Sequence, residues 1–171
     1  IANASFIYGH YPQDIISTDI GPGNCLIDEW VRKNSEKKYD RDGLIARSGK
    51  SKNIIVKKLI KNFKKIKYHK NFRKSLDIKD FDLSPVRGLS LEDGAATLTD
   101  FTAGILWFYI VFPTNKDGVD RVGLTKENLK EFGLQKIIGP WTIVVCGGGR
   151  KNKFLMERLR DFFYMDKNII I

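Results

Sequence analysis

The sequence predicts an α/β fold, in which helices flank a sheet that has crossover connections. Three observations lead to this prediction. Strand-like stretches rich in β-branched residues alternate with amphipathic, helix-like stretches along the chain. Glycine-rich turns stand between a strand and a helix at two places, 21–23 and 147–149. Neither an internal repeat nor a low-complexity linker interrupts the 171 residues, so we expect a single domain, 1–171.

Four strands and four helices are expected in chain order. The strands are predicted at 1–8, 15–18, 141–146 and 168–171. The first helix follows Asn24 as its N-cap and carries an apolar stripe, and a second, strongly basic helix covers 54–63. The third begins after Ser90, with Asp93 completing an approximate capping box, and runs towards 106. The fourth spans 152–163, and 39–49 is expected to be turn-rich.

Composition limits the class of protein without deciding its function. The chain is 42% hydrophobic and 29% charged, as in ordinary globular proteins, and its formal net charge of +10 admits polyanionic partners. Its basic residues are spread along the chain, however, and the densest cluster, 57–70, follows a helical apolar pattern. We therefore interpret that cluster as a solvated helix face, and we expect no nucleic-acid partner.

The cysteines and the apolar runs indicate a cytoplasmic protein with no membrane span. Cys25 and Cys146 lie far apart and no signal-peptide pattern precedes them, which is typical of a reduced compartment. The apolar run 105–112 is shorter than the roughly 20 residues that cross a bilayer. His10 and His69 have no metal-type spacing with the cysteines, so no residue is assigned to a metal site.

The first glycine turn places a carboxylate beside a helix N-terminus. Asp19 follows the second strand, and Gly21, Gly23 and Asn24 lead into the next helix. Glycines let backbone N–H groups approach a phosphate, and the helix dipole favours an anion there. Asp19 could accept a proton from a nucleophile or help to hold Mg²⁺. An ordinary strand-to-helix turn, in which Asp19 accepts local amide hydrogen bonds, is the alternative that the pattern leaves open.

The second glycine turn consists of Gly147, Gly148 and Gly149, followed by Asn152 and a helix. Three consecutive glycines are costly in chain entropy and suggest that a ligand or another backbone comes close. Neither a Rossmann fingerprint nor a P-loop is present. A tight turn without a ligand and a nucleotide-binding turn both fit this segment, and the presence of two such turns in one domain favours binding.

The residues resemble the family of anhydro-N-acetylmuramic acid kinases. Asp19-Ile20-Gly21-Pro22-Gly23-Asn24 is similar to the family's Asp-Thr-Gly-Pro-Gly-Asn motif. Five other stretches agree in order and approximate spacing: 1–3, 39–43 with 46–49, 74–77 with 80–81, 91–99 with 101–103, and 145–149 with 152 and 155–156. Six ordered matches are far more specific than any one of them.

The resemblance implies an actin-like (ribonuclease H-like) ATPase lobe, with a mixed sheet flanked by helices. By this likeness ATP and Mg²⁺ are the cofactors, and anhydro-N-acetylmuramic acid is opened with water and phosphorylated on O6 during peptidoglycan recycling. Asp19 would be the general base. Gly21, Gly23 and Asn24 would lie against the phosphates, and Gly147, Gly148, Gly149 and Asn152 against the nucleoside. The chain would be the C-terminal lobe, with the family's N-terminal lobe absent and a homodimer left open.

Departures from the family pattern keep two alternatives open. Ile20 replaces a threonine whose hydroxyl could face a phosphate, Phe72-Arg73 replaces a Pro-Pro pair, and 105–140 matches nothing expected of the family. These departures favour a fragment or binding module of the same fold that has lost turnover. The other alternative is a basic nucleic-acid-binding domain, which would bind DNA or RNA in a salt-sensitive way.

Overall fold

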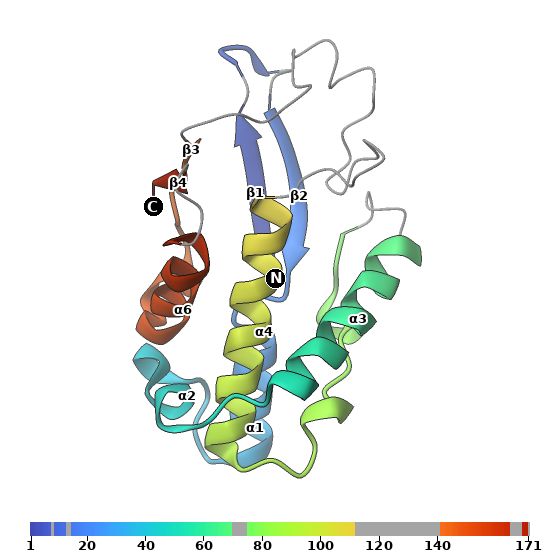
Figure 1. Ribbon diagram of the computed structural model, residues 1–171, viewed down its shortest axis with the longest axis vertical. Coiled ribbons are helices and arrows are strands. Elements are labelled where there is room, and N and C mark those ends of the chain that lie inside the picture. The colour runs from blue at the N-terminus through green and yellow to red at the C-terminus, as the bar shows by residue number, and fades with distance from the viewer. Residues whose placement is uncertain (8, 13–14, 70–74, 112–140, 165–168, 171) are drawn as a thin grey trace.

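The computed structural model describes 1–171 except 8, 13–14, 70–74, 112–140, 165–168 and 171. One long helix lies in the middle of the molecule, and the other helices and an N-terminal hairpin pack around it (Figure 1). The predicted Lys74, Phe72-Arg73 and Asn168 positions lie outside the described residues, as does most of 105–140.

The N-terminal strands form an antiparallel hairpin. Strand β1 (Ala2–Ile7) pairs with β2 (Ile15–Gly21), with Asn3 opposite Asp19 and a register shift between Ala2 and Asn3. Ser5 and Ser17 share a 2.7 Å hydrogen bond across the pair. Both predicted strands are confirmed, and β2 extends further than 15–18, to the first glycine turn.

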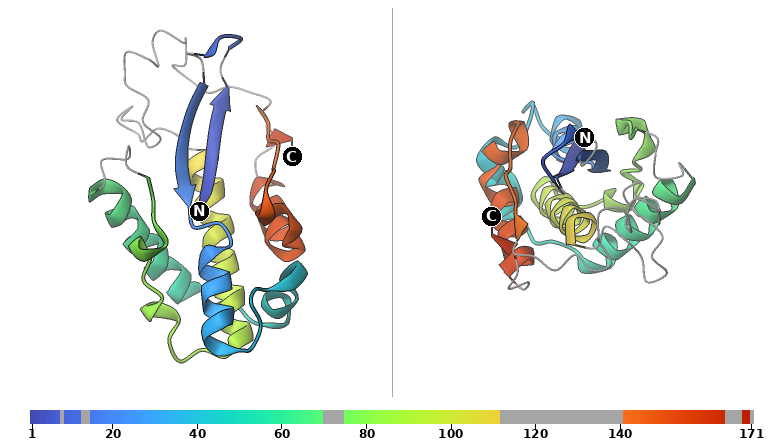
Figure 2. Two further views of the ribbon diagram at one scale, coloured as in Figure 1. Left: turned by 180° about the vertical axis from the view of Figure 1, so that it is seen from behind. Right: turned by 90° about the horizontal axis from the view of Figure 1, so that it is seen from above.

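The central helix is α4 (Leu91–Val111), which contacts α1, α2, α3, α6 and β2. The view from above in Figure 2 shows it surrounded by these helices. By length and apolar composition α4 is the one candidate for a membrane span among the described residues, yet 67% of the tested window is buried inside the protein. Its apolar character is therefore that of a core helix, as the sequence predicted for this run.

Helix α4 starts with half of the predicted capping box. The Ser90 hydroxyl accepts a hydrogen bond from the Asp93 backbone N–H at 3.1 Å. The Asp93 carboxylate does not return to Ser90. It accepts instead from the Lys50 backbone N–H at 2.7 Å and pairs with Lys52 at 2.6 Å. Asp93 thus fixes the segment before α3 to the start of α4, because its carboxylate reaches across the chain.

Helix α1 (Cys25–Asn34) packs its predicted apolar stripe on α4. The Trp30 indole N–H donates to the Leu91 carbonyl at 2.9 Å. Its ring lies where a Cβ on Gly94 would stand, 2.3 Å from the nearest ring atom. Gly94 is therefore required by the close approach of a bulky ring, since any side chain there would displace Trp30.

Helix α3 (Asn53–His69) separates an apolar face from a basic one. Leu59 and Phe63 are buried, and the Phe63 ring contacts Phe81, Phe101 and Tyr109 with centroids 5.7 to 6.2 Å apart. The lysines described on this helix are exposed, at positions 57, 58, 61, 64 and 65. The interpretation of this cluster as a solvated helix face is confirmed for those positions.

The segment predicted to be turn-rich contains a helix. A 3₁₀ turn (Arg41–Gly43) leads into α2 (Leu44–Ser48), which packs on α4. The prediction missed α2 because five residues are too few to show a helical period. Asp40, four residues before α2, is buried, and its carboxylate accepts from the Ile45 and Ala46 backbone N–H groups at 2.8 and 3.0 Å.

The C-terminal region consists of a short strand pair and a helix. Strand β3 (Trp141–Thr142) pairs in parallel with β4 (Ile169–Ile170). A 3₁₀ turn (Gly148–Lys151) then precedes α6 (Lys153–Tyr164). The expected strand over 141–146 is wrong beyond Thr142, because only two residue pairs meet a partner strand. The expected helix is confirmed, and Arg158 ties it to Asp100 of α4 at 2.7 Å.

The fold is α/β, as predicted, but its described strands do not form one mixed sheet. They form two separate two-stranded sheets, the antiparallel β1–β2 pair and the parallel β3–β4 pair. Helices, and above all α4, supply most of the core. The expected mixed sheet is wrong for the described strands, because a sequence pattern identifies extended segments but not their partners. Which strands pair depends on how the segments pack around α4.

Candidate functional site around two glycine turns

Asp19 is held in place from two sides. Its carboxylate accepts a hydrogen bond from the Asn3 side-chain amide at 3.2 Å and another from the Leu76 backbone N–H at 2.7 Å. Asn3 is its cross-strand partner in the hairpin, and Leu76 lies in the chain that follows α3. The side chain is half-buried. Asp19 is therefore a positioned carboxylate at the end of β2, directly before the first glycine turn.

The first glycine turn is packed against the rest of the protein. A Cβ on Gly21 would lie 3.1 Å from Ile105 and 3.4 Å from Leu106, both on α4. Gly23 has a φ of +58°, and a Cβ there would lie 3.3 Å from the backbone of Ile1 and Ala2. Gly23 is favoured by its positive φ and by the close backbone, whereas a side chain at Gly21 would fit only if Ile105 moved by a few tenths of an ångström.

Asn24 differs from the expectation in one respect. It stands at the N-cap position of α1, but its side chain makes no capping hydrogen bond. Its backbone is already helical, at φ −77° and ψ −9°, whereas a capping side chain needs an extended backbone. Its Oδ1 is buried without a hydrogen-bond partner. The prediction that the Asn24 side chain caps α1 is therefore wrong.

Ile20 points into the core between these groups. Its side chain is only 2% exposed and belongs to the main apolar cluster. Neighbouring strand residues point to opposite faces, so Asp19 and Ile20 do not share an environment. A threonine hydroxyl at position 20 would be directed inward in this arrangement. The replacement is therefore weak support for lost activity.

The second glycine turn is open. Among the described residues, no atom comes within 4 Å of a Cβ built on Gly147, Gly148 or Gly149. Asn152, at the end of the turn, is buried, and its Oδ1 accepts from the Leu155 backbone N–H at 3.0 Å, capping α6. Its own backbone N–H donates to the Gly149 carbonyl at 3.0 Å. Space for a ligand thus lies beside the glycines, while the Asn152 side chain is occupied by the helix.

The two turns lie against different elements. The first packs on α4 at Ile105 and Leu106, whereas Asn152, after the second, packs beside Gly43. The structure joins Asp19, Gly21, Gly23 and Asn24 in one continuous turn, with Asn152 and the three later glycines in another. Sequence reasoning missed Asn3 and Leu76, which hold the Asp19 carboxylate. The hairpin register opposite Asp19 was the signal that could have found Asn3.

The described residues contain no group of three or more histidine, cysteine, aspartate or glutamate side chains able to hold a metal ion together. Mg²⁺ in phosphoryl-transfer sites is usually held by one or two carboxylates together with the substrate's phosphates. Asp19, directly before the first glycine turn, is one carboxylate of the kind that this weaker requirement names. A metal held by protein side chains alone is not supported in this part of the chain.

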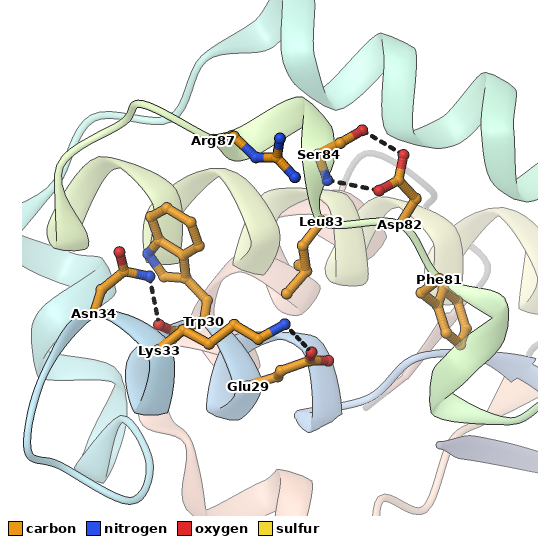
Figure 3. Close-up of a pocket in the computed structure, with 9 residues that line it drawn as sticks. All are labelled: Glu29, Trp30, Lys33, Asn34, Phe81, Asp82, Leu83, Ser84 and Arg87. Carbon is orange, nitrogen blue, oxygen red and sulfur yellow. Dashed lines mark hydrogen bonds and ion pairs between the residues drawn. The ribbon is translucent and has the colours of Figure 1, made fainter.

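A hollow of about 380 Å³ lies elsewhere, between α1 and 81–87 (Figure 3). Most of its polar groups are satisfied by their neighbours: Lys33 pairs with Glu29, and Asp82 accepts from the Ser84 backbone N–H at 2.7 Å. These pairings leave no reason to expect a ligand in the hollow. None of the predicted site residues lines it. No sequence motif pointed to this hollow, because its lining comes from two separate segments.

A half-buried carboxylate at a strand end, followed by a glycine turn and a helix N-terminus, is an arrangement typical of α/β proteins that bind phosphates. The comparisons with known proteins define the class more closely. The family model described as anhydro-N-acetylmuramic acid kinase matches residues 1–105. The chain belongs to this family, which confirms the resemblance seen in the sequence.

Curated relatives extend the match beyond the family model. An anhydro-N-acetylmuramic acid kinase of Pelagibacter ubique is 42% identical over 171 residues, covering 100% of this chain and 40% of the relative. The enzyme of that name from Zymomonas mobilis is 37% identical over 166 residues, 96% of this chain and 38% of the relative. The chain thus spans about 40% of the length of these relatives. The first match includes 105–140, so that segment is shared with a relative.

Proposed function

We propose that this chain is the nucleotide-binding part of an ATP-dependent kinase that opens and phosphorylates anhydro-N-acetylmuramic acid. In this proposal 1–171 form one domain, the C-terminal lobe of a two-lobed, actin-like kinase. Family membership supports the substrate class and the use of ATP. One observation carries the catalytic assignment: Asp19 is oriented by Asn3 and Leu76 immediately before a glycine turn.

The proposed reaction couples a hydrolysis to a phosphoryl transfer. Asp19 takes a proton from a water molecule, whose oxygen forms a bond to the anomeric carbon. The bond from that carbon to O6 breaks, and O6 takes the γ-phosphoryl group of ATP, giving N-acetylmuramate 6-phosphate and ADP. One carboxylate suffices, because O6 is captured by phosphorus and needs no separate acid. This differs from the paired carboxylates of most glycosidases.

The turns are assigned to different parts of the nucleotide. Gly21, Gly23 and Asn24 are proposed to face the phosphates at the start of α1, where the helix dipole favours negative charge. The open turn 147–149 leaves room for the nucleoside, with Asn152 fixing its end. Mg²⁺, when bound, would neutralise charge on the transferring group and would be held mainly by the phosphates, because Asp19 is assigned as the base. Positioning and charge then do most of the catalysis.

The proposal also names a cellular setting. The product belongs to the recycling of cell-wall amino sugars, a cytoplasmic pathway, and the α4 apolar segment is accounted for by the core. The sugar and ATP are the expected partners, with a homodimer left open and no nucleic acid. Since the chain spans about 40% of its relatives, activity is proposed for the complete enzyme.

Nucleotide titration tests the binding half of this proposal. Calorimetry with Mg·ATP and ADP should show binding that survives Asp19→Asn and is abolished by Gly148→Val. Asp19→Asn keeps the shape of the side chain but removes the base, its negative charge and one of its two accepting oxygens, whereas Gly148→Val fills the open turn. Failure of the unmodified chain to bind at millimolar nucleotide would count against the proposal.

Turnover is tested by placing this chain in the matching region of the Pelagibacter ubique relative. ADP release in the presence of anhydro-N-acetylmuramic acid should fall by about 10² to 10⁴-fold on Asp19→Asn. A chimaera that binds ATP and never phosphorylates the sugar would instead identify a binding module of the same fold. The Asn3→Ala variant, which loosens Asp19 without removing it, should show a smaller decrease.

A further inference from the structure

We infer that residues 40–47, which we call the clasp, position the second glycine turn for nucleotide binding, with Gly43 as the central positioning residue. The inference rests on the proposed function, since it concerns how the same nucleotide site is held. The inference explains what holds the open turn 147–149 in place. Because no atom of the part of the chain that the structure describes lies within 4 Å of a Cβ built on any of the three glycines, side-chain packing from that part does not hold the turn.

Gly43 fits against the residues that end the turn. A Cβ at this position would stand 2.3 Å from Asn152 Oδ1 and 2.5 Å from Phe154 Cβ. The φ of Gly43 is +74°, a conformation that residues with side chains rarely adopt. Both conditions require glycine. The clasp backbone can therefore lie directly on the start of α6, which a residue with a side chain would push away.

Three further contacts hold the clasp to α6. Asp42 pairs with Lys153 at 3.3 Å. The Arg47 guanidinium lies 5.0 Å from the centre of the Phe154 ring and also pairs with Glu157. Exposed pairs contribute little each, but all three join the same eight residues to the same helix start. Figure 1 shows α2 beside one end of α6.

The clasp is itself rigid at its start. The buried Asp40 carboxylate accepts two backbone N–H groups from α2, which fixes the turn that carries Gly43. Two successive contacts link Gly43 to the second glycine turn. Gly43 packs on Asn152, and the Asn152 backbone N–H donates to the Gly149 carbonyl at 3.0 Å. A displacement of Asn152 by Gly43 therefore reaches the glycine turn within one hydrogen bond.

The test compares two glycines that both have a positive φ, Gly43 and Gly88. Gly88 has a φ of +86°, and nothing lies within 4 Å of a Cβ built there. Gly88→Ala introduces left-handed strain alone, whereas Gly43→Ala adds the collision with Asn152. Amide hydrogen exchange at Leu155 reports the Asn152 cap, and calorimetry with ADP reports the site.

Gly43→Ala should remove the protection of the Leu155 amide and weaken ADP binding at least about tenfold. Gly88→Ala should leave the Leu155 amide protection and the ADP affinity unchanged, although the variant is less stable than the unmodified chain. If Gly43→Ala does not fold, Arg47→Gln replaces it, and a decrease of about threefold in ADP affinity is expected. The inference is overturned if Gly43→Ala, or Arg47→Gln in its place, binds ADP within twofold of the affinity of the unmodified chain. An unmodified chain that binds no ADP overturns the proposed function first, which separates the two failures.

Discussion

The two glycine turns of this protein look alike in sequence and differ in their surroundings. At the first, Cβ atoms on Gly21 or Gly23 would lie within 3.1 to 3.3 Å of α4 or β1. At the second, Cβ atoms on Gly147, Gly148 and Gly149 would meet no atom of the described residues within 4 Å. A side chain at the first turn would press on neighbouring segments, whereas a side chain at the second would meet no neighbour among the described residues.

The difference between the packed and the open turn shows two reasons why a binding motif can contain glycine: close packing within the fold, and space for a ligand. In a packed turn a substitution disturbs folding, so a loss of activity there says little about ligand contact. In an open turn, a substitution at a glycine without a positive φ leaves folding nearly intact, so a loss of binding there indicates that the ligand occupies the space. The second turn is therefore the better place to test whether a nucleotide binds.

The largest expected effect is on stability at the first turn. Gly23→Val places a β-branched residue at φ +58° against the backbone of β1, and should lower the free energy of unfolding by about 3 kcal/mol. Urea unfolding measures this. Gly88→Val, at φ +86° in open space, serves as the control and should lose less. Equal losses in the two variants would show that packing against β1 does not matter.

An intermediate effect is expected at Gly147. Its φ of +79° and ψ of −168° fall in a region that is essentially restricted to glycine, so Gly147→Ala should cost about 2 kcal/mol in unfolding free energy. The cause is backbone conformation alone, since the Cβ meets no neighbour. Thermal unfolding measures this. An unchanged melting temperature in Gly147→Ala would mean that the exposed turn relaxes locally, and the contrast would then be between a packed turn and an adaptable one.

The smallest effect on stability is expected at Gly148. Its φ lies outside the left-handed region and the space around it is open, so Gly148→Val should change unfolding free energy by no more than about 0.5 kcal/mol. The same variant is expected to lose nucleotide binding. A destabilised Gly148→Val would contradict the difference between the two turns, because it would reveal contacts at a turn described as open.

Other glycines in the family-like stretches follow the packed pattern. A Cβ on Gly49 would lie 2.1 Å from the Glu92 carbonyl, and one on Gly94 would enter the Trp30 ring. These stretches therefore hold α1, α4 and the segment before α3 together. Their resemblance to the family reflects a shared core as well as a shared site.

Much of the local structure could be predicted from the sequence. Long periodic segments became helices, and the first two β-rich segments became a hairpin, because periodicity follows directly from which face is buried. Short elements were the failures. Helix α2 was taken for turns, and the strand after Trp141 was expected to be longer than its two paired residues. The sequence placed Asp19 beside the turn but could not identify the Leu76 amide that holds it.

The sequence alone determined the family, the order of most elements and the identity of the residues in both glycine turns, because these depend on local pattern and residue type. The tertiary structure alone decided that the Asn3 amide and the Leu76 N–H hold Asp19, and that the first glycine turn packs against other segments while the second lies open. Each of these depends on contacts between segments distant in the chain. Such contacts form only when α4 gathers the surrounding elements around one core.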